Sequence, residues 1–195
     1  MTSAYSTLLI FGTSHVGKST LAKRIGKEVG WPVLSTDKMG RHPGRPWPSV
    51  RKQVAEYYSK LSVETIYWFL RVHHENMWPH LRDRISTASQ SNSGCVIEGS
   101  ALRPEFIADL QPSRTLTVGL HASNAFLRQR MEAESLYENQ DMHTKQLIEK
   151  FIQRSLTDND SIVEASKHHG LTLIDVSDPS SLGIEADRLI EKLRQ

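Results

Sequence analysis

The sequence has very few cysteines and no long apolar run, and each shortage excludes a class of protein. Cys95 is the single cysteine among 195 residues, so neither an internal disulfide nor a site with several cysteine ligands can form. Apolar runs are short, such as residues 8–11, whereas a membrane-spanning helix needs about 20 apolar residues. The first residues also lack the basic and apolar stretch of a secretory signal. We therefore expect a cytoplasmic protein that does not cross a membrane.

An excess of charge of one sign is also missing. The chain has 24 basic and 22 acidic side chains, a formal net charge of +2, which does not indicate a polyanionic partner such as a nucleic acid. Apolar residues make up 38% of the chain, which is enough for a hydrophobic core. Because the length fits one domain and no linker divides the chain, we expect residues 1–195 to form a single domain, as a monomer or homodimer.

Strand and helix patterns alternate along the chain. Short, branched apolar stretches predict five strands, at residues 7–11, 31–35, 94–98, 115–120 and 171–175. Apolar residues at helical spacing predict helices at residues 18–29, 123–135, 142–154, 162–169 and 181–194. This alternation is typical of an α/β protein with a parallel sheet that helices cover on both sides.

One interval, residues 38–93, interrupts the alternation because it contains no convincing strand. It opens with a loop rich in proline, glycine and arginine at residues 41–48. Two helical segments follow, at residues 49–60 and 63–89, and Pro79 would kink or split the second. Long excursions from a compact α/β domain are often lids or binding elements. We therefore predict that this insertion binds the substrate.

The loop after the first strand matches G-x-x-x-x-G-K-[ST] in full and leads into a predicted helix. Its glycines let backbone N–H groups face a phosphate, the lysine reaches the β- and γ-phosphates, and the last hydroxyl binds Mg²⁺. The predicted nucleotide-binding residues are Gly12, Thr13, Ser14, His15, Val16, Gly17, Lys18, Ser19 and Thr20. Lys18 is expected to be catalytic and Ser19 a metal ligand, whereas His15 is expected at the solvent edge, contributing only its backbone.

Two acidic residues end neighbouring strands. Asp37 follows the second strand and Glu98 ends the third, and ligands of such sheets bind at the carboxyl ends of the strands. Asp37 could accept the proton of an acceptor hydroxyl or hold a Mg²⁺ water, and Glu98 could act on Mg²⁺ directly or through water. Each could instead be structural, Asp37 as a helix N-cap. We predict that Asp37 is catalytic and that both residues bind the metal and contact the substrate.

Arginines could offset the negative charge of a transferring phosphoryl group. Three lie after the fourth strand and could close over the nucleotide as a lid, namely Arg128, Arg130 and Arg154. Three lie near the acidic strand ends and could hold an anionic acceptor, namely Arg41, Arg45 and Arg103. Arg128 and Arg41 are the preferred members of the two sets, and Arg128 is expected to be catalytic and to contact the nucleotide. Trp47, between two prolines, is also predicted to touch the ligand, whereas the apolar residues 67–70 are expected to pack in the core.

Four segments together resemble the small P-loop kinases that phosphorylate metabolites, a group that includes nucleotide, shikimate and gluconate kinases. They are GTSHVGKSTL at residues 12–21, LSTD at 34–37, VIEGSALRP at 96–104 and LTLIDVSD at 171–178, and they most resemble 2-phosphoglycerate kinase and its relatives. The resemblance implies a three-layer α/β/α sandwich whose five parallel strands have the order 2-3-1-4-5. It also implies ATP with Mg²⁺ as the donor, an acceptor-binding insertion and a lid at about residues 128–158.

The preferred function is therefore an ATP-dependent transfer of the γ-phosphoryl group to a hydroxyl or phosphate of a small, anionic metabolite. A nucleoside, nucleotide or nucleic-acid 5′-end kinase is the first alternative, although the small net charge argues against a long polynucleotide. A nucleotide-operated switch ATPase is the second alternative. The sequence contains no Asn-Lys-x-Asp motif for reading guanine, which argues against a GTPase switch.

Overall fold

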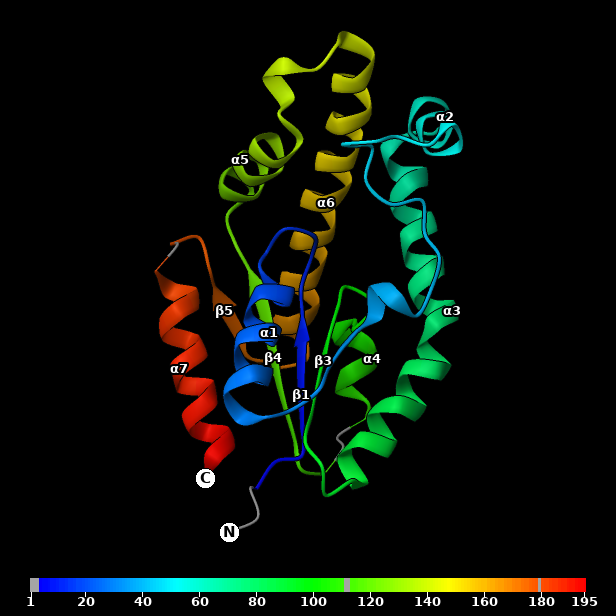
Figure 1. The fold of residues 1–195 in the computed structure, drawn as a ribbon. Helices are drawn as coiled ribbons and strands as arrows, with labels where there is room; N and C mark the ends of the chain where they lie inside the picture. Colours follow the sequence, from blue (N-terminus) through cyan, green and yellow to red (C-terminus); the bar gives the residue numbers. More distant parts are fainter. Residues whose placement is uncertain (1–3, 111–112, 179) are drawn as a thin grey trace.

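A five-stranded parallel sheet forms the centre of the protein. The computed structural model describes residues 4–110, 113–178 and 180–195 (Figure 1). The strands are β1 (Thr7–Phe11), β2 (Val33–Ser35), β3 (Cys95–Glu98), β4 (Thr115–His121) and β5 (Leu173–Asp175). Their order is β2-β3-β1-β4-β5, and every pairing is parallel, which confirms the predicted topology. All five residues of β1 are buried, as expected for a central strand covered on both faces.

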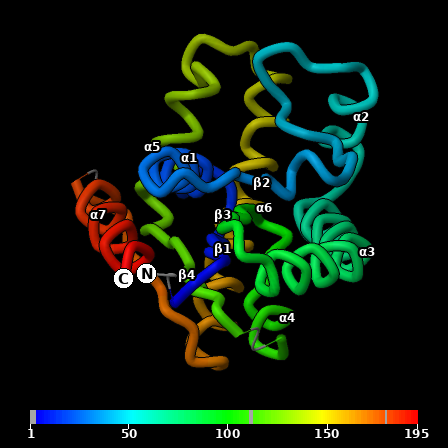
Figure 2. The backbone as a smooth tube through the Cα atoms, turned by 60° about the horizontal axis from the view of Figure 1, so that its bottom comes forward, coloured from blue at the N-terminus to red at the C-terminus, as the bar shows by residue number. Residues whose placement is uncertain are grey.

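Helices cover both faces of this sheet, so the predicted three-layer arrangement is confirmed. On one side, α1 (Lys18–Val29) packs against α7 (Ser181–Arg194). On the other side lie α3 (Val63–Gln90), α4 (Pro104–Ala108) and α6 (Met142–His168), with α6 in contact with both other helices. Figures 1 and 2 show the two groups on opposite sides of β1 and β4.

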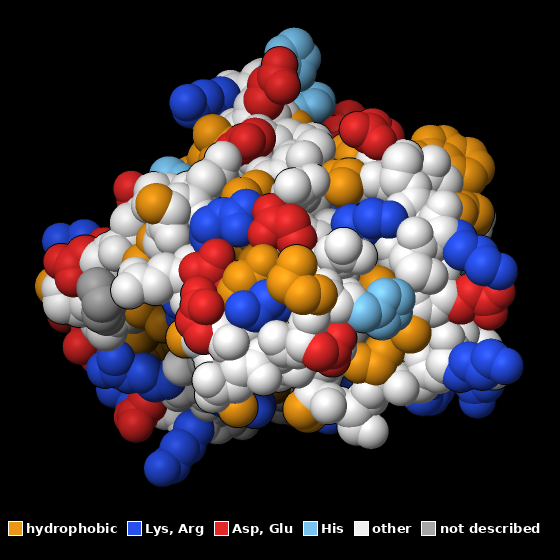
Figure 3. Space-filling model, turned by 90° about the horizontal axis from the view of Figure 1, so that it is seen from above, with side chains coloured by type: hydrophobic (Ala, Val, Ile, Leu, Met, Phe, Trp, Pro, Cys, Tyr) orange, Lys and Arg blue, Asp and Glu red, His pale blue; other side chains and the backbone are white. Residues whose placement is uncertain are grey.

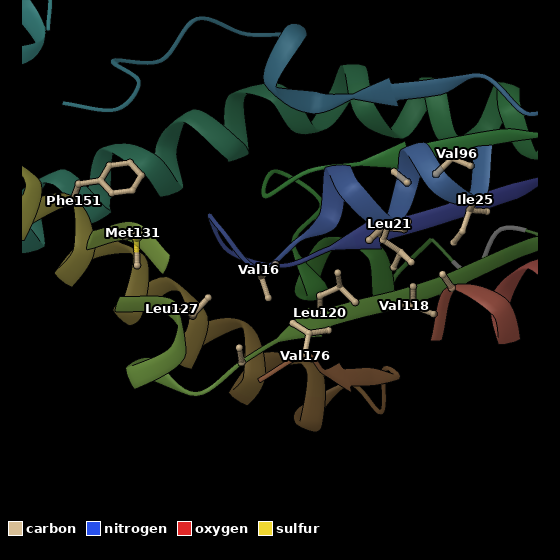
Figure 4. Close-up of a cluster of buried hydrophobic side chains, with 14 of the residues drawn as sticks. Val16, Leu21, Ile25, Val96, Val118, Leu120, Leu127, Met131, Phe151 and Val176 are labelled. Atoms are coloured by element: carbon tan, nitrogen blue, oxygen red, sulfur yellow. The ribbon is translucent and has the colours of Figure 1, made fainter. Parts of the chain in front are cut away.

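The core joins the sheet to the loop that follows β1. Leu21 and Ile25 of α1 belong to the same buried cluster as Val118 and Leu120 of β4 (Figure 4). Val16 of the loop is fully buried in this cluster. The Val16 side chain therefore anchors the loop to the hydrophobic core.

The insertion between β2 and β3 is helical, and its helices begin and end close to the predicted residues. A short 3-10 helix, η1 (Thr36–Lys38), precedes α2 (Lys52–Lys60) and the 28-residue helix α3. Pro79 does not split α3, and its side chain is exposed, so the missing hydrogen bond lies on the solvent side. The expected burial of residues 67–70 is wrong in part, because Trp68 is 58% and Phe69 45% exposed.

The segment after β4 forms a helical hairpin that rises above the sheet (Figure 1). It consists of α5 (Asn124–Ser135), the 3-10 helix η2 (Tyr137–Asn139) and α6. Residues 142–154 and 162–169 were predicted as two helices, but α6 is continuous, because Asp158 and Asn159 have buried hydrogen-bonding partners in other elements. Despite the length of α3 and α6, no helix in the described part of the chain is apolar enough to cross a membrane.

Candidate active site

At both ends of the loop between β1 and α1, the backbone φ angle is positive and favours glycine. Gly12 has φ +145°, and a Cβ atom there would lie 2.4 Å from the carbonyl oxygen of Leu120. Gly17 has φ +100° and is the N-cap of α1, so the helix begins directly at the loop. The free N–H groups of this helix end and of the loop form a site suited to phosphate.

Lys18 and Ser19, the first two residues of α1, have different surroundings. The Nζ of Lys18 donates a hydrogen bond to the carbonyl oxygen of Thr13 at 2.7 Å. Burial lowers the pKa of Lys18, and the nearby carboxylates of Glu98 and Asp37 oppose that shift. Ser19 is exposed and lines a cavity of about 230 Å³. The polar groups around this cavity include Ser14, Lys18, Ser19, Asp37, Arg130 and Arg154.

The pairing of the strands brings the two predicted acids to the same edge of the sheet as the loop. Glu98 is in register with Ile10 of β1 and Ser35 of β2, so Asp37 follows only two residues after that level. Asp37 is exposed and lines the cavity, whereas Glu98 is buried and does not line it. Glu98 therefore does not fit the predicted contact with substrate, and its position suits an electrostatic effect on Lys18.

Oxygen atoms suited to Mg²⁺ are present beside the loop. The Ser19 hydroxyl and the Asp37 carboxylate line the same cavity, and both are hard oxygen ligands. Within the described residues, no group of three or more His, Cys, Asp or Glu side chains could hold a metal ion. An ion here would take its remaining ligands from phosphate oxygens and water, which is the usual mode of Mg²⁺ binding in phosphoryl transfer.

Two arginines face the cavity without a carboxylate partner among the described residues. Arg154 of α6 is only 7% exposed, and its guanidinium lies 4.4 Å from the ring centre of Phe151. Arg130 of α5 lies over the ring of Phe126. A guanidinium that has no ion-pair partner in the described chain is suited to a bound anion such as a phosphoryl group, and of these two Arg154 is buried whereas Arg130 is exposed.

The preferred lid residue, Arg128, does not fit this role. It donates two hydrogen bonds to Glu149, at 2.8 and 2.7 Å, and a third to Glu132 at 3.3 Å. These contacts raise its pKa, and the side chain does not line the cavity. Arg130 and Arg154 replace Arg128 as the candidate arginines for the nucleotide.

This geometry can be compared with known proteins. The sequence matches no protein-family profile, and no curated protein is significantly similar to it. Solved structures do match along nearly the whole chain. A gluconokinase from Sinorhizobium meliloti 1021 is 19% identical with a TM-score of 0.56, covering 98% of this chain and 97% of its own. The shikimate kinase of Bacteroides thetaiotaomicron is 16% identical with a TM-score of 0.51 and coverages of 97% and 98%.

A third structure is the thymidylate kinase of Candida albicans, which is 16% identical with a TM-score of 0.50, covering 100% of this chain and 94% of its own. The chain has the fold of the small-molecule P-loop kinases. At these identities the likeness concerns the fold, so the roles of the individual residues depend on the geometry of the site itself.

Within this kinase fold, Arg103 lies away from the cavity, and its predicted contact with an acceptor is wrong. The side chain is fully buried and donates hydrogen bonds to Asp158 at 2.6 Å, Glu105 at 3.2 Å and Ser161 at 3.2 Å. These hydrogen bonds hold the start of α4 to α6, so the guanidinium is not available to bind an acceptor. The sequence could not indicate this, because Asp158 lies 55 residues away.

The loop at residues 41–48 provides fewer of the predicted ligand contacts than expected, because neither Arg41 nor Trp47 lines the cavity. Arg45 lines it and pairs with Glu134 of α5, whereas Arg41 lines a neighbouring chamber. Trp47 is buried, with its ring centre 4.8 Å from that of Phe151 and 5.8 Å from that of His15. The predicted contact between Trp47 and ligand is therefore wrong, since this ring supports the phosphate-binding loop from within the protein.

His15 is not at the solvent edge, contrary to expectation. Its side chain is 3% exposed, packs between Trp47 and Phe151, and has Nε2 3.0 Å from a carboxylate oxygen of Glu134. Burial, together with nearby cations such as Arg45, lowers the pKa of His15 to about 3. The imidazole is therefore neutral at physiological pH and joins the loop to the segments on either side of the cavity.

The sequence analysis missed several residues of the cavity, and His74 is the most deeply buried titratable one among them. His74 of α3 lines the cavity, is buried, and has Nε2 3.4 Å from the Ser100 hydroxyl, while burial lowers its pKa to about 3. The signal was present in the spacing of Leu70, His74 and Leu81, which share the inward face of the helix. A histidine on the buried face of a helix can belong either to a binding site or to the hydrophobic core. Only the residues packed around it in the folded protein distinguish these two roles.

Proposed function

We propose that this protein is an ATP-dependent phosphotransferase that transfers the γ-phosphoryl group to a hydroxyl or phosphate of a small metabolite. The observation that carries the proposal is the shared cavity. The phosphate-binding loop, the exposed carboxylate of Asp37 and the unpaired guanidinium of Arg154 all line it. These are the three kinds of group that phosphoryl transfer needs, namely a phosphate cradle, a group that orients the acceptor, and a cation that offsets developing charge.

The loop and α1 would bind the polyphosphate of ATP. Backbone N–H groups between Gly12 and Ser19 would hold the β-phosphate, and Lys18 would turn from the Thr13 carbonyl toward the β- and γ-phosphates. The Ser19 hydroxyl and the Asp37 carboxylate, which both line the cavity, would hold Mg²⁺. When bound, Mg²⁺ neutralises charge on the β- and γ-phosphate oxygens.

Asp37 and the arginines would act on the other side of the transferring group. Asp37 would accept or orient the proton of the acceptor hydroxyl, for which its exposed position at the cavity is suited. Arg154 and Arg130 would donate to the equatorial oxygens as negative charge spreads over them. Approach of α5 and α6 to the loop would exclude water and limit hydrolysis.

The direct test is ADP release from ATP and Mg²⁺ with a panel of phosphorylated acids, polyols, nucleosides and 5′-hydroxyl oligonucleotides. The Lys18→Ala variant supplies the background. One acceptor class that raises turnover well above this background would support a kinase and identify the class. Hydrolysis that depends on Lys18 but on no acceptor would contradict the proposal and favour a switch ATPase.

The role of Asp37 has its own test. Asp37→Asn should retain ATP binding, because the phosphate cradle is unchanged, and should lose about 100-fold or more in the transfer rate. Single-turnover transfer and ATP titration separate the two effects. Near-normal transfer in this variant would remove Asp37 from the chemical step.

A long polynucleotide acceptor has less support than a small one. Figure 3 shows the molecule from above Figure 1, on the face that carries the tip of the α5–α6 hairpin and α2, and there basic and acidic side chains are interspersed. Binding to a nucleic-acid backbone requires a basic stripe or patch. The oligonucleotides in the panel decide this point, since their binding would weaken steeply with salt.

A further inference from the structure

A second chamber of about 210 Å³ opens beside the cavity of the phosphate-binding loop. The two spaces share Leu70 and His73 of α3 and Arg154 of α6 among their lining residues, so they lie side by side. Apolar and aromatic side chains form most of the second chamber, namely Pro43, Tyr57, Tyr58, Ile66, Phe69 and Leu70. This chamber lies within the insertion that would bind the acceptor.

The aromatic side chains present rings rather than polar groups to this space. The Tyr58 hydroxyl donates a hydrogen bond to the Gly44 carbonyl at 2.9 Å, and the Tyr57 hydroxyl donates one to the Ile66 carbonyl at 3.4 Å. The Tyr57 ring lies edge to face with the rings of Tyr58, at 5.1 Å, and Phe69, at 6.2 Å. Burial raises the pKa of Tyr57 to about 12, so the phenol stays neutral. An additional ring could join this edge-to-face arrangement.

The charges around the chamber restrict the ligand further. Arg41 and Arg154 line it together with His42 and His73, and no carboxylate or carboxamide is among its lining residues in the described chain. A cationic ligand would be repelled. A polyol would place many of its hydroxyls against Pro43, Ile66, Phe69 and Leu70, whose side chains have no polar atom, and each tyrosine hydroxyl already donates its proton to a carbonyl. A nucleobase would find few acceptors for the N–H groups on its edge, because no carboxylate or carboxamide is among the described lining residues.

The volume sets the size of the ligand. A cavity of about 150 Å³ lined by apolar side chains holds one benzene ring. The chamber of about 210 Å³ therefore has room for a single six-membered ring with a small substituent.

We infer that the acceptor carries one carbocyclic aromatic ring and is neutral or anionic, with the ring in this chamber and the reacting hydroxyl directed toward Asp37. This inference rests on the proposed function for the position of the hydroxyl. The ring subsite itself can be measured by binding alone, without any transfer reaction.

The experiment is calorimetric titration of the ADP-bound protein with 3-phenyllactate and matched compounds. 3-Phenyllactate should bind at least about tenfold more tightly than lactate or gluconate, which lack the ring. It should also bind more tightly than 3-cyclohexyllactate, which lacks the aromatic character, and than phenylalaninol, which is cationic. Equal or tighter binding of gluconate, the cyclohexyl compound or phenylalaninol would overturn the inference, and tighter binding of thymidine would overturn it in favour of a nucleobase.

Two neighbouring residues of α3 provide a variant and its control. Phe69 lines the chamber, whereas Trp68 is the more exposed residue of the two and lines neither space. Phe69→Ala should weaken 3-phenyllactate binding about tenfold, and Trp68→Ala, which removes only a ring that lies edge to face with Phe69 at 5.1 Å, should weaken it less than about twofold. Equal effects of both substitutions, or no effect of Phe69→Ala, would overturn the assignment.

The outcomes for the ring subsite and for the kinase are distinguishable. Ring-selective binding that Phe69→Ala weakens about tenfold, without acceptor-dependent ADP release, would support the subsite and contradict the kinase. Transfer to gluconate or another open-chain acceptor that Phe69→Ala does not alter would support the kinase and overturn the ring subsite.

Discussion

At the scale of single residues, an arginine's partners decide what it can do. Arg128 and Arg154 are 26 positions apart and both belong to the hairpin above the sheet, yet two carboxylates hold the first and none holds the second. A guanidinium already paired with carboxylates gains little from a phosphate, because it would have to exchange one anion for another. An unpaired buried guanidinium gains the whole charge-assisted interaction.

This difference predicts opposite outcomes for matched substitutions. Arg154→Met should lower the rate of phosphoryl transfer about 100-fold, the usual loss when one donor to a developing charge is removed. Arg128→Met should change the transfer rate by less than about threefold. Single-turnover assays at saturating ATP measure both, and a larger loss in Arg128→Met than in Arg154→Met would reverse the assignment.

At the scale of elements, α6 connects the phosphate-binding loop to the rest of the fold. The Thr13 hydroxyl donates to the Ser155 carbonyl at 3.0 Å, Asn159 donates to the Ala122 carbonyl, and Asp158 accepts from Arg103 of the turn before α4. These contacts use polar residues that would weaken an isolated helix. They explain why α6 continues through a stretch that the sequence pattern assigns to a break.

The buried ion pair between Arg103, before α4, and Asp158 of α6 gives a prediction for stability. Arg103→Met should lower the free energy of unfolding by about 3–5 kcal/mol, because it leaves the Asp158 carboxylate buried without its cation. Arg24→Met, which removes an exposed ion pair with Asp187, should cost less than about 1 kcal/mol. Urea unfolding measures both. A loss below 1 kcal/mol for Arg103→Met would mean that the pair contributes no more than a surface contact.

At the scale of the whole molecule, two buried neutral histidines link folding to pH. His15 and His74 have a pKa of about 3 in the folded protein, whereas an exposed histidine has one near 6.5. The unfolded chain therefore binds more protons between these values, so stability is lost as the pH falls below about 6.5. The loss is up to about 1.4 kcal/mol per pH unit for each histidine.

The contribution of His74 can be isolated. Between pH 7 and pH 5 the wild-type protein should lose up to about 2 kcal/mol more than His74→Met, which has no imidazole at that position to protonate. Urea unfolding at both pH values gives the two differences. Equal losses in the two proteins would show that His74 does not titrate with a lowered pKa.

The local features of this protein were determined by its sequence. The phosphate-binding loop is a contiguous motif in which Gly12 and Gly17 have positive φ angles, and the strand and helix patterns depend on neighbours at most a few positions away. The sheet order also came out as predicted, from the resemblance to small P-loop kinases. With the sheet order known, Asp37 was expected at the same edge as the loop, since parallel strands end together there.

Only the tertiary structure decided which polar side chains remain free to bind a ligand. Arg103 pairs with a residue 55 positions away, Arg128 with one 21 positions away, and His15 is buried by Trp47 from the insertion. Such pairings depend on how distant segments pack, and no local pattern records them. The free energy of a charged or aromatic side chain is set by its surroundings in space, so its role is determined only when the chain has folded.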